Sequence, residues 1–224
     1  MDQLIQDHDA IMDKYDPDQK VGLIVDEWGI WTNVEPGTNP GFLYQQNSLR
    51  DAIIAALNFH IFHRHADRVH MANIAQMVNV LQAMILTDGP RMLRTPTYWT
   101  FEMFKVHQGE DNLELNVDCG TVGVGDSQIP VISASASRDS KTGVVHLSLV
   151  NTHPGKAIAV DADLGNIKPK TVQGRVLTAD AVDAHNTFEQ PDQVSPVEFS
   201  GASMNGSKVS VIMPAKSVVV LTFK

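Results

Sequence analysis

The sequence predicts an α/β fold followed by an all-β fold: the C-terminal part of a (β/α)8 barrel in residues 1–110, then a jelly-roll-like β-sandwich in residues 111–224. Two nearly continuous apolar runs, residues 21–25 and 69–72, alternate with helical patterns, as in a parallel sheet covered on both faces. The later half consists of short runs of Val, Ile and Leu separated by Gly, Pro, Asn and Ser, which is typical of strands joined by turns.

Four helices are expected in the first half. Apolar residues recur at helical spacing in three segments, and a fourth follows a proline: residues 4–15, 49–61, 74–85 and 96–104. Ser48 with Asp51 three residues later resembles a capping box, and Thr95 before Pro96 is a good N-cap and first-turn pair. The Asp-Gly-Pro run at residues 88–90 is expected to end the third helix.

The two strands of this half are too few to close a barrel. A complete eight-stranded barrel needs roughly 200 residues or more, and the first half supplies only two clear strands within 110 residues. A two-stranded parallel sheet leaves both edges and much apolar surface uncovered. We therefore expect a partner polypeptide that supplies the missing N-terminal barrel segment.

The second half contains six candidate strands, in residues 131–135, 144–150, 157–160, 171–177, 209–213 and 218–223. Apolar and polar residues alternate in the second of these, which gives it one clearly apolar face. The domain boundary is expected between Gln108 and Asn112, where the composition changes.

Composition excludes several classes of partner. The formal charge of −9 would repel phosphate backbones and anionic lipid, so we expect neither nucleic acid nor a membrane as partner. No apolar run approaches the roughly 18 residues needed to span a bilayer. Cys119 is the single cysteine, so no internal disulfide requires an oxidising compartment, and a cytoplasmic location is favoured.

Asp26 and Glu27 are the sharpest candidates for chemistry, because they stand at the C-terminal end of a buried parallel strand. In (β/α) barrels that rim builds the active site. Side chains alternate along a strand, so the two acids point differently and cannot share one role. We expect Glu27 to project into a cavity as a nucleophile or acid/base; the alternative is that both are solvated loop acids.

Two further residues near this rim are candidates for sugar binding. Trp31 lies in a long loop, residues 28–46, and its ring could stack on the C–H face of a sugar; ordinary packing under the loop is the alternative. Gln76 follows the second strand and could bond to sugar hydroxyls; the alternative is an amide that faces solvent. Glu35, in the same loop, could stand in as a second acid, but nothing indicates a tuned pKa.

No metal or cofactor is expected. Four histidines lie close together in the sequence, at positions 60, 63, 65 and 70. Their spacing matches no metal-binding motif of the HExxH type, and the chain contains no glycine-rich phosphate loop.

Four runs of the sequence resemble glycoside hydrolase family 51, the α-L-arabinofuranosidases with a (β/α)8 barrel and a C-terminal jelly-roll-like sandwich. The runs are DEWGIW (residues 26–31), EPGTNPGFLYQQNSLRDA (35–52), HADRVHMANIAQMVNVLQAMILTDG (65–89) and TPTYWTFEMFKVHQG (95–109). The resemblance covers residues 1–110 by motif and the sandwich half by the order and type of its elements.

The resemblance implies a role for each candidate. Glu27 matches the nucleophile at the end of barrel strand 7, Gln76 matches a glutamine that binds arabinofuranose, and Trp31 matches an aromatic near the leaving group. Gly29 stands where the family often has asparagine. The family's acid/base glutamate belongs to strand 4, which would precede Met1, so this chain would hold strands 7 and 8 only.

The sequence thus predicts the C-terminal portion of a retaining, exo-acting α-L-arabinofuranosidase. Its substrate would be an arabinofuranose-containing oligosaccharide or polysaccharide, and the resemblance implies a homo-oligomer. The alternative from another class is a non-catalytic arabinose-binding or assembly module, because the acid/base is absent while Trp31 and Gln76 remain.

Overall fold

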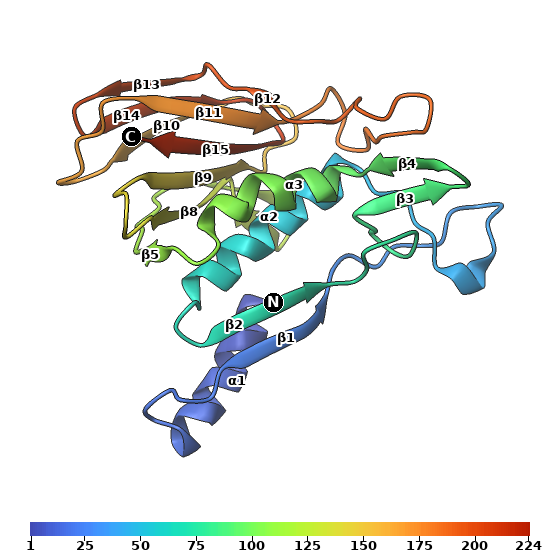
Figure 1. The fold of residues 1–224 in the computed structure, drawn as a ribbon, viewed down its shortest axis with the longest axis horizontal. Helices are drawn as coiled ribbons and strands as arrows, with labels where there is room; N and C mark the ends of the chain where they lie inside the picture. Colours follow the sequence, from blue (N-terminus) through green and yellow to red (C-terminus); the bar gives the residue numbers. More distant parts are fainter.

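The computed structural model describes residues 1–224 as a stack of layers (Figure 1). A parallel pair of strands with the N-terminal helix lies at one end, two helices lie in the middle, and two antiparallel sheets lie at the other end. None of the helices combines the length and the apolar character needed to span a bilayer.

The first half contains α1 (Asp2–Tyr15), β1 (Leu23–Trp28), a 3-10 helix (Pro40–Phe42), α2 (Leu49–Arg64), β2 (Val69–Ile74), β3 (Ile85–Asp88), β4 (Arg91–Arg94), α3 (Pro96–Phe104) and a second 3-10 helix (Lys105–His107). The second half contains β5 (Asp111–Leu113), β6 (Thr121–Val124), β7 (Ser127–Pro130), β8 (Ile132–Arg138), β9 (Val145–Asn151), β10 (Ile158–Asp163), β11 (Val172–Leu177), β12 (Val197–Glu198), β13 (Ala202–Asn205), β14 (Lys208–Met213) and β15 (Ser217–Phe223).

The larger sheet is buried on both faces. Its six strands run in the order β12-β11-β15-β9-β8-β5, and a three-stranded sheet, β10-β14-β13, covers one face. Alternate residues of β15 divide between the two sides: Val219 and Leu221 join the core between the sheets, whereas Val218 and Val220 pack against α2 and α3. The consecutive apolar residues Val218 to Leu221 of β15 fit this position, because both faces of the strand are covered.

The parallel pair β1–β2 is held to the helices by aromatic packing. Val25 pairs with Ala72 and Trp28 with Ile74. The Trp28 ring is 4% exposed, and it lies 5.7 Å from Phe59 and 5.4 Å from Phe62, in edge-on geometry that aromatic pairs prefer. The tryptophan beside Glu27 is thus part of the core, and it fixes the carboxyl end of β1.

Helix α1 is fastened by one buried arginine. Arg68, just before β2, is 1% exposed, and its guanidinium bonds to Asp9, Asp13 and Asp16. It also donates to the carbonyl oxygen of Val21 at 3.0 Å. Charge-assisted bonds of this kind are short and directional, so Arg68 joins the helix, the turn after it and the start of β2.

Histidines and serines form a polar seam between α2 and the larger sheet. His60 is fully buried, with Nδ1 2.8 Å from Ser133 Oγ and Nε2 3.0 Å from Ser148 Oγ. His63 Nδ1 lies 2.7 Å from Ser135 Oγ. The seam continues to the second 3-10 helix, where His107 Nδ1 lies 2.7 Å from Ser137 Oγ. Each serine comes from the sheet face that meets the helices.

Burial keeps these histidines neutral. It lowers the pKa of His63 to about 4 and that of His107 to about 3, with the neighbouring histidines adding to the effect on His107. The pKa of His60 is also well below its ordinary value, because burial disfavours the charged ring.

The expected helix over residues 74–85 is wrong. That segment is an irregular loop followed by the β3–β4 hairpin, with positive φ at Asn79 and Leu81. Non-local partners satisfy its backbone: Leu81 N donates to Leu43 O, and Asn47 and Thr95 donate to Ala83 O. The apolar spacing matched a helix by coincidence, because long-range bonds outweigh local periodicity here. The run at residues 88–90 closes the hairpin instead of ending a helix.

The other helices, the two parallel strands and the six strands of the second half are confirmed, with ends shifted by a few residues. Ser48 N donates to Asp51 Oδ2 at 2.8 Å, and Thr95 Oγ1 accepts from Tyr98 N, as the capping patterns predict. The sequence did not predict β5, β12, β13 or the β3–β4 and β6–β7 hairpins. The chain is a mixed helix and sheet structure, and it contains no closed barrel.

The polar seam makes stability depend on pH. A histidine whose pKa is lower in the folded state binds its proton more readily in the unfolded state. Its contribution to the free energy of unfolding is therefore complete above about pH 6.5 and is lost as the pH falls toward 4. For His63 the loss is roughly 3 kcal/mol. Urea unfolding of His63→Gln at pH 7 and pH 4.5 should show a smaller pH-dependent loss than the unmodified chain. The exposed His8, changed to Gln, is the control; an equal loss in His63→Gln would contradict the assignment.

Candidate functional site

The predicted site residues lie at the carboxyl ends of the parallel pair. Glu27 is the last residue but one of β1, and Gln76 stands two residues beyond β2. Ala75 N donates to Trp28 O at 2.9 Å, which ties the two strand ends together. The side chains of both Glu27 and Gln76 are exposed. The structure therefore brings the predicted nucleophile and the predicted sugar-binding amide to the same edge.

Trp31 is exposed over 66% of its surface, and a buried glutamine holds its neighbours. Gln45 is 1% exposed; its Oε1 accepts from Thr32 N at 2.9 Å and its Nε2 donates to Ile30 O at 3.0 Å. The carboxamide thus bonds to the backbone on both sides of Trp31, as an adjacent strand would. The indole is presented outward, and packing under the loop does not describe it.

A second buried glutamine lies against the residue that follows Trp28. Gln82 is fully buried, and neither atom of its carboxamide has a hydrogen-bond partner within the chain. A Cβ atom on Gly29 would fall 1.8 Å from Gln82 Nε2. A side chain at position 29 would therefore displace the Gln82 carboxamide from the space that it occupies.

The long loop after β1 closes on itself through its acidic residue. Glu35 N donates to Tyr44 O at 2.9 Å, and Glu35 Oε1 accepts from Gln46 N at 3.2 Å. Burial raises the pKa of Tyr44, and the negative charge of Glu35 adds to this effect. Glu35 thus has a structural partner that accounts for its position, and nothing in its contacts assigns it a role as an acid.

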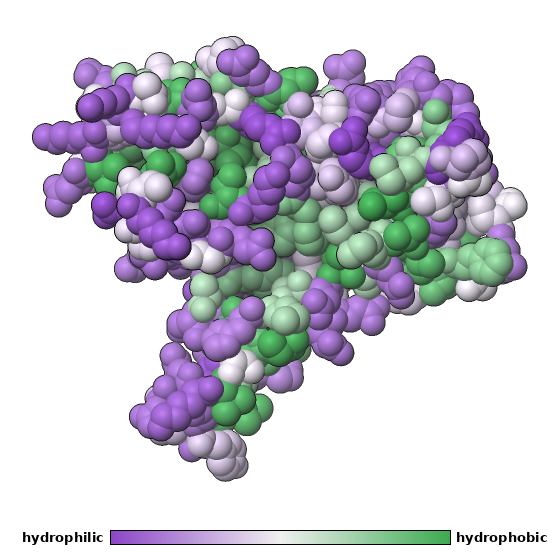
Figure 2. Space-filling model, viewed as in Figure 1, coloured by the Kyte–Doolittle hydropathy of each residue, from purple (hydrophilic) through white to green (hydrophobic).

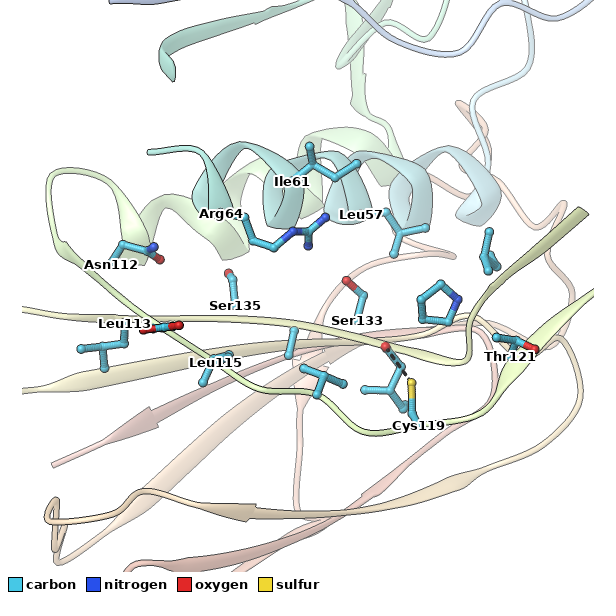
Figure 3. Close-up of a pocket in the computed structure, with 16 residues that line it drawn as sticks. Leu57, Ile61, Arg64, Asn112, Leu113, Leu115, Cys119, Thr121, Ser133 and Ser135 are labelled. Carbon is cyan, nitrogen blue, oxygen red and sulfur yellow. Dashed lines mark hydrogen bonds between the residues drawn. The ribbon is translucent and has the colours of Figure 1, made fainter. Parts of the chain in front are cut away.

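Two cavities can be compared with the position of Glu27, and Glu27 lines neither of them. The first, of about 710 Å³, lies between α2 and the start of β8 (Figure 3). Leu57 and Ile61 line it from the helix, while Ser133 and Ser135 line it from the strand, and both serine hydroxyls are engaged by His60 and His63. Two strands form only one short stretch of a barrel rim, and the expectation that Glu27 projects into a cavity stays a prediction.

A smaller cavity, of about 500 Å³, lies nearer the loops. Residues 41–44 line it together with Asn79, Leu86 and Phe188. None of the three predicted site residues takes part in it. Its walls are mostly apolar, and Tyr44 is the one titratable side chain among the residues that line it.

The family model for the alpha-L-arabinofuranosidase C-terminal domain matches residues 26–217. The chain belongs to this family. The match begins at Asp26 and therefore includes Glu27, Trp31 and Gln76, and it covers both sheets except for β15, of which it reaches only the first residue. The parent family consists of glycoside hydrolases, so the enzyme class expected from the sequence is confirmed for the family.

Individual relatives agree with this membership. The chain is 46% identical over 222 residues to an intracellular exo-alpha-L-arabinofuranosidase of Bacteroides ovatus, covering 99% of the chain and 43% of the relative. It is 25% identical over 206 residues to an intracellular exo-alpha-(1->5)-L-arabinofuranosidase of Streptomyces lividans, covering 87% of the chain and 31% of the relative.

Solved arabinofuranosidase structures share the fold. The crystal structure of a GH51 arabinofuranosidase from Xanthomonas axonopodis pv. citri superposes with a TM-score of 0.97 at 50% identity, covering all of this chain and 45% of that one. A family 51 enzyme from Bifidobacterium longum has a TM-score of 0.80 at 24% identity, covering 91% of this chain and 42% of that one, which shows the fold alone. The chain spans less than half the length of these relatives.

Sequence reasoning missed Gln45 and Gln82. Both lie in the runs that carry the resemblance, at LYQQ and VLQA. For Gln82 the available signal was a polar residue within the otherwise apolar run VLQAMIL, whereas Gln45 is followed by three polar residues and gave no such signal. The partners themselves, at Ile30 and Thr32, lie more than ten residues away and could not be inferred from spacing.

The contact between Gly29 and Gln82 predicts a coupled pair of substitutions. Gly29→Ala should destabilise the chain by about 1–3 kcal/mol, because the added methyl group would displace the buried Gln82 carboxamide. In Gly29→Ala/Gln82→Ala the space is vacated, so the double variant should lose less than the sum of the single losses. Urea unfolding of the four proteins measures the difference, and strictly additive losses would contradict the contact.

Proposed function

We propose that this chain is the C-terminal portion of a retaining, exo-acting α-L-arabinofuranosidase, with Glu27 as nucleophile. Membership of the arabinofuranosidase family supports the activity. The observation that carries the assignment of Glu27 is its exposed position at the carboxyl end of a parallel strand. Gln76 lies just beyond the carboxyl end of the neighbouring strand β2. Such strand ends hold the catalytic groups of (β/α)8 barrels.

The pair β1–β2 corresponds, in this proposal, to strands 7 and 8 of a barrel completed by further polypeptide. Uncovered apolar side chains support it. Ile24 of β1 is 46% exposed and Met71 of β2 is 54% exposed, although both lie on strands. Figure 2 shows apolar residues gathered on this part of the molecule and on the loops beside β3. Large exposed apolar patches mark interfaces, and the relatives are more than twice as long as this chain.

The mechanism follows from one carboxylate in this chain and one outside it. Glu27 attacks the anomeric carbon of a terminal arabinofuranosyl group while an acid/base residue of the completing segment protonates the leaving oxygen. A covalent arabinosyl-enzyme forms, and water activated by the same residue then hydrolyses it with net retention. The two carboxyl groups would lie about 5 Å apart. Gln76 would hold sugar hydroxyls, and Trp31 would lie on the leaving-group side.

Several properties of the whole enzyme follow from its relatives. The names of the Bacteroides and Streptomyces proteins specify exo action inside the cell, and we assign both to this protein. A relative from Bifidobacterium longum is named for a 1->6 linkage and the Streptomyces protein for a 1->5 linkage, so the proposal is limited to terminal arabinofuranosyl residues. A homo-oligomer, which the resemblance implies, remains part of the proposal.

Glu27→Gln should abolish activity in a complemented enzyme. Co-expression of this chain with the upstream segment of the Bacteroides ovatus relative should restore cleavage of an aryl arabinofuranoside. Glu27→Gln should then lower the rate roughly a thousandfold or more, because the amide cannot act as a nucleophile. The control is Asp67→Asn, an exposed acid at the opposite end of the pair. Failure to recover activity, or a Glu27→Gln variant as active as the control, would count against the proposal.

A non-catalytic arabinose-binding or assembly module is the second candidate, and exposed Trp31 and Gln76 favour it. Isothermal titration of the chain alone with arabinose oligomers separates the two. Binding at millimolar concentration or below, lost in Trp31→Ala and without turnover in the complemented enzyme, would support the module. No heat of binding by the chain alone is the expected result if the sugar site needs the completing segment.

A further inference from the structure

The backbone around Trp31 is held by hydrogen bonds to the side chain of Gln45 and not by a neighbouring strand. Gln45 Oε1 accepts a hydrogen bond from Thr32 N at 2.9 Å, and Gln45 Nε2 donates a hydrogen bond to Ile30 O at 3.0 Å. The residue between these two bonds is Trp31. A planar carboxamide with both bonds made has one orientation only, so the direction in which the indole leaves the backbone is determined by Gln45.

Gln45 is itself immobile because the chain on both sides of it is anchored. Tyr44 O accepts from Glu35 N, and Gln46 N donates to the Glu35 carboxylate. Two residues further on, Asn47 donates to Thr97 Oγ1 at 2.8 Å, immediately before α2 begins. The carboxamide is therefore attached to the helical layer that carries the rest of the site.

The other end of the same segment is held by packing. Gln82 fills the space beside Gly29, and Ala75 N bonds to Trp28 O. The backbone from Trp28 to Thr32 is thus constrained at both ends. The Trp31 side chain is 66% exposed and makes no aromatic or cation contact that would hold it from above.

We propose that Gln45 is a positioning residue that holds Trp31 in place for the leaving-group sugar, a role that rests on the proposed function. Preorganising an aromatic surface removes the entropy cost of ordering it on binding. The benefit goes to substrates whose leaving group reaches Trp31. A substrate with a leaving group of one atom gains nothing from it.

The test compares two substrates in the complemented enzyme. Gln45→Ala should lower kcat/KM for an arabinofuranosyl disaccharide about tenfold, the equivalent of losing one buried hydrogen-bonded brace, mainly through KM. Activity on arabinofuranosyl fluoride should stay within about twofold. The matched control is Gln46→Ala, the adjacent glutamine, whose side chain makes no hydrogen bond. Equal losses on both substrates would overturn the positioning role.

The variant Gln45→Glu adds a second measurement, a pH dependence that is not expected if Gln45 has only a structural role. The carboxylate can still accept from Thr32 N but repels Ile30 O, and protonation restores a donor to that oxygen. Burial beside a carbonyl raises the pKa of such a carboxyl group. Protonation of the leaving oxygen makes the disaccharide-to-fluoride ratio of kcat/KM depend on pH in every variant, so each ratio is divided by that of the unmodified enzyme at the same pH. The normalised ratio should rise as the pH falls from 8 to 5 in Gln45→Glu and stay constant in Gln45→Ala. A constant normalised ratio in both would contradict the proposal.

Hydrogen exchange separates this inference from the proposed function. In the chain alone, the Thr32 amide should exchange at least about tenfold faster in Gln45→Ala than in the unmodified chain, with no change in Gln46→Ala. An unchanged exchange rate of the Thr32 amide would contradict the proposal that Gln45 holds this backbone in place. An unmodified complemented enzyme that is inactive on both substrates, while Thr32 exchange responds as stated, would instead refute the arabinofuranosidase assignment.

Discussion

Burial of α2 on two opposite sides is the interaction on which the rest of the structure depends. Ala55 and Phe62 face the parallel pair and its aromatic cluster, whereas Leu49 and Ala56 face the larger sheet. A helix that is apolar on both sides is stable only between two layers. The strand ends that carry Glu27 and Gln76 are positioned through this helix, and so is Gln45, which lies four residues before its first residue.

The same helix explains why the two halves of the sequence are joined. Val218 and Val220 of the last strand pack on residues of α2 and α3, and the seam of histidines and serines adds directional bonds to that contact. Apolar packing tolerates sliding, but hydrogen bonds between fixed donors and acceptors do not. The helical layer consequently has one position along the sheet. The candidate site residues, which lie on elements packed against these helices, are fixed relative to the sheet in the same way.

The sequence predicted those parts of the fold whose signal is local. Continuous apolar runs indicated β1, β2 and β15, and the cap residues Ser48 and Thr95 indicated where two helices begin. The loop over residues 74–84 could not be predicted, because its conformation depends on Asn47 and Leu43 from another part of the chain. Glu27, Trp31 and Gln76 were candidates because of their positions at the strand ends and in the long loop, and the family resemblance gave each a role. Gln45 and Gln82, which lie beside them, required coordinates because a buried amide gives no periodic pattern.

Arg68 has a consequence for how the N-terminal helix is attached. Its three carboxylate partners all precede residue 17, while Arg68 belongs to the turn that starts β2. The helix is therefore attached to a point far along the chain as well as through the peptide link that leads into β1, and Val21 of that link accepts from the same arginine. A cut between Pro17 and Asp18 would break none of the three ion pairs, so the N-terminal helix is a segment that could be supplied as a separate peptide.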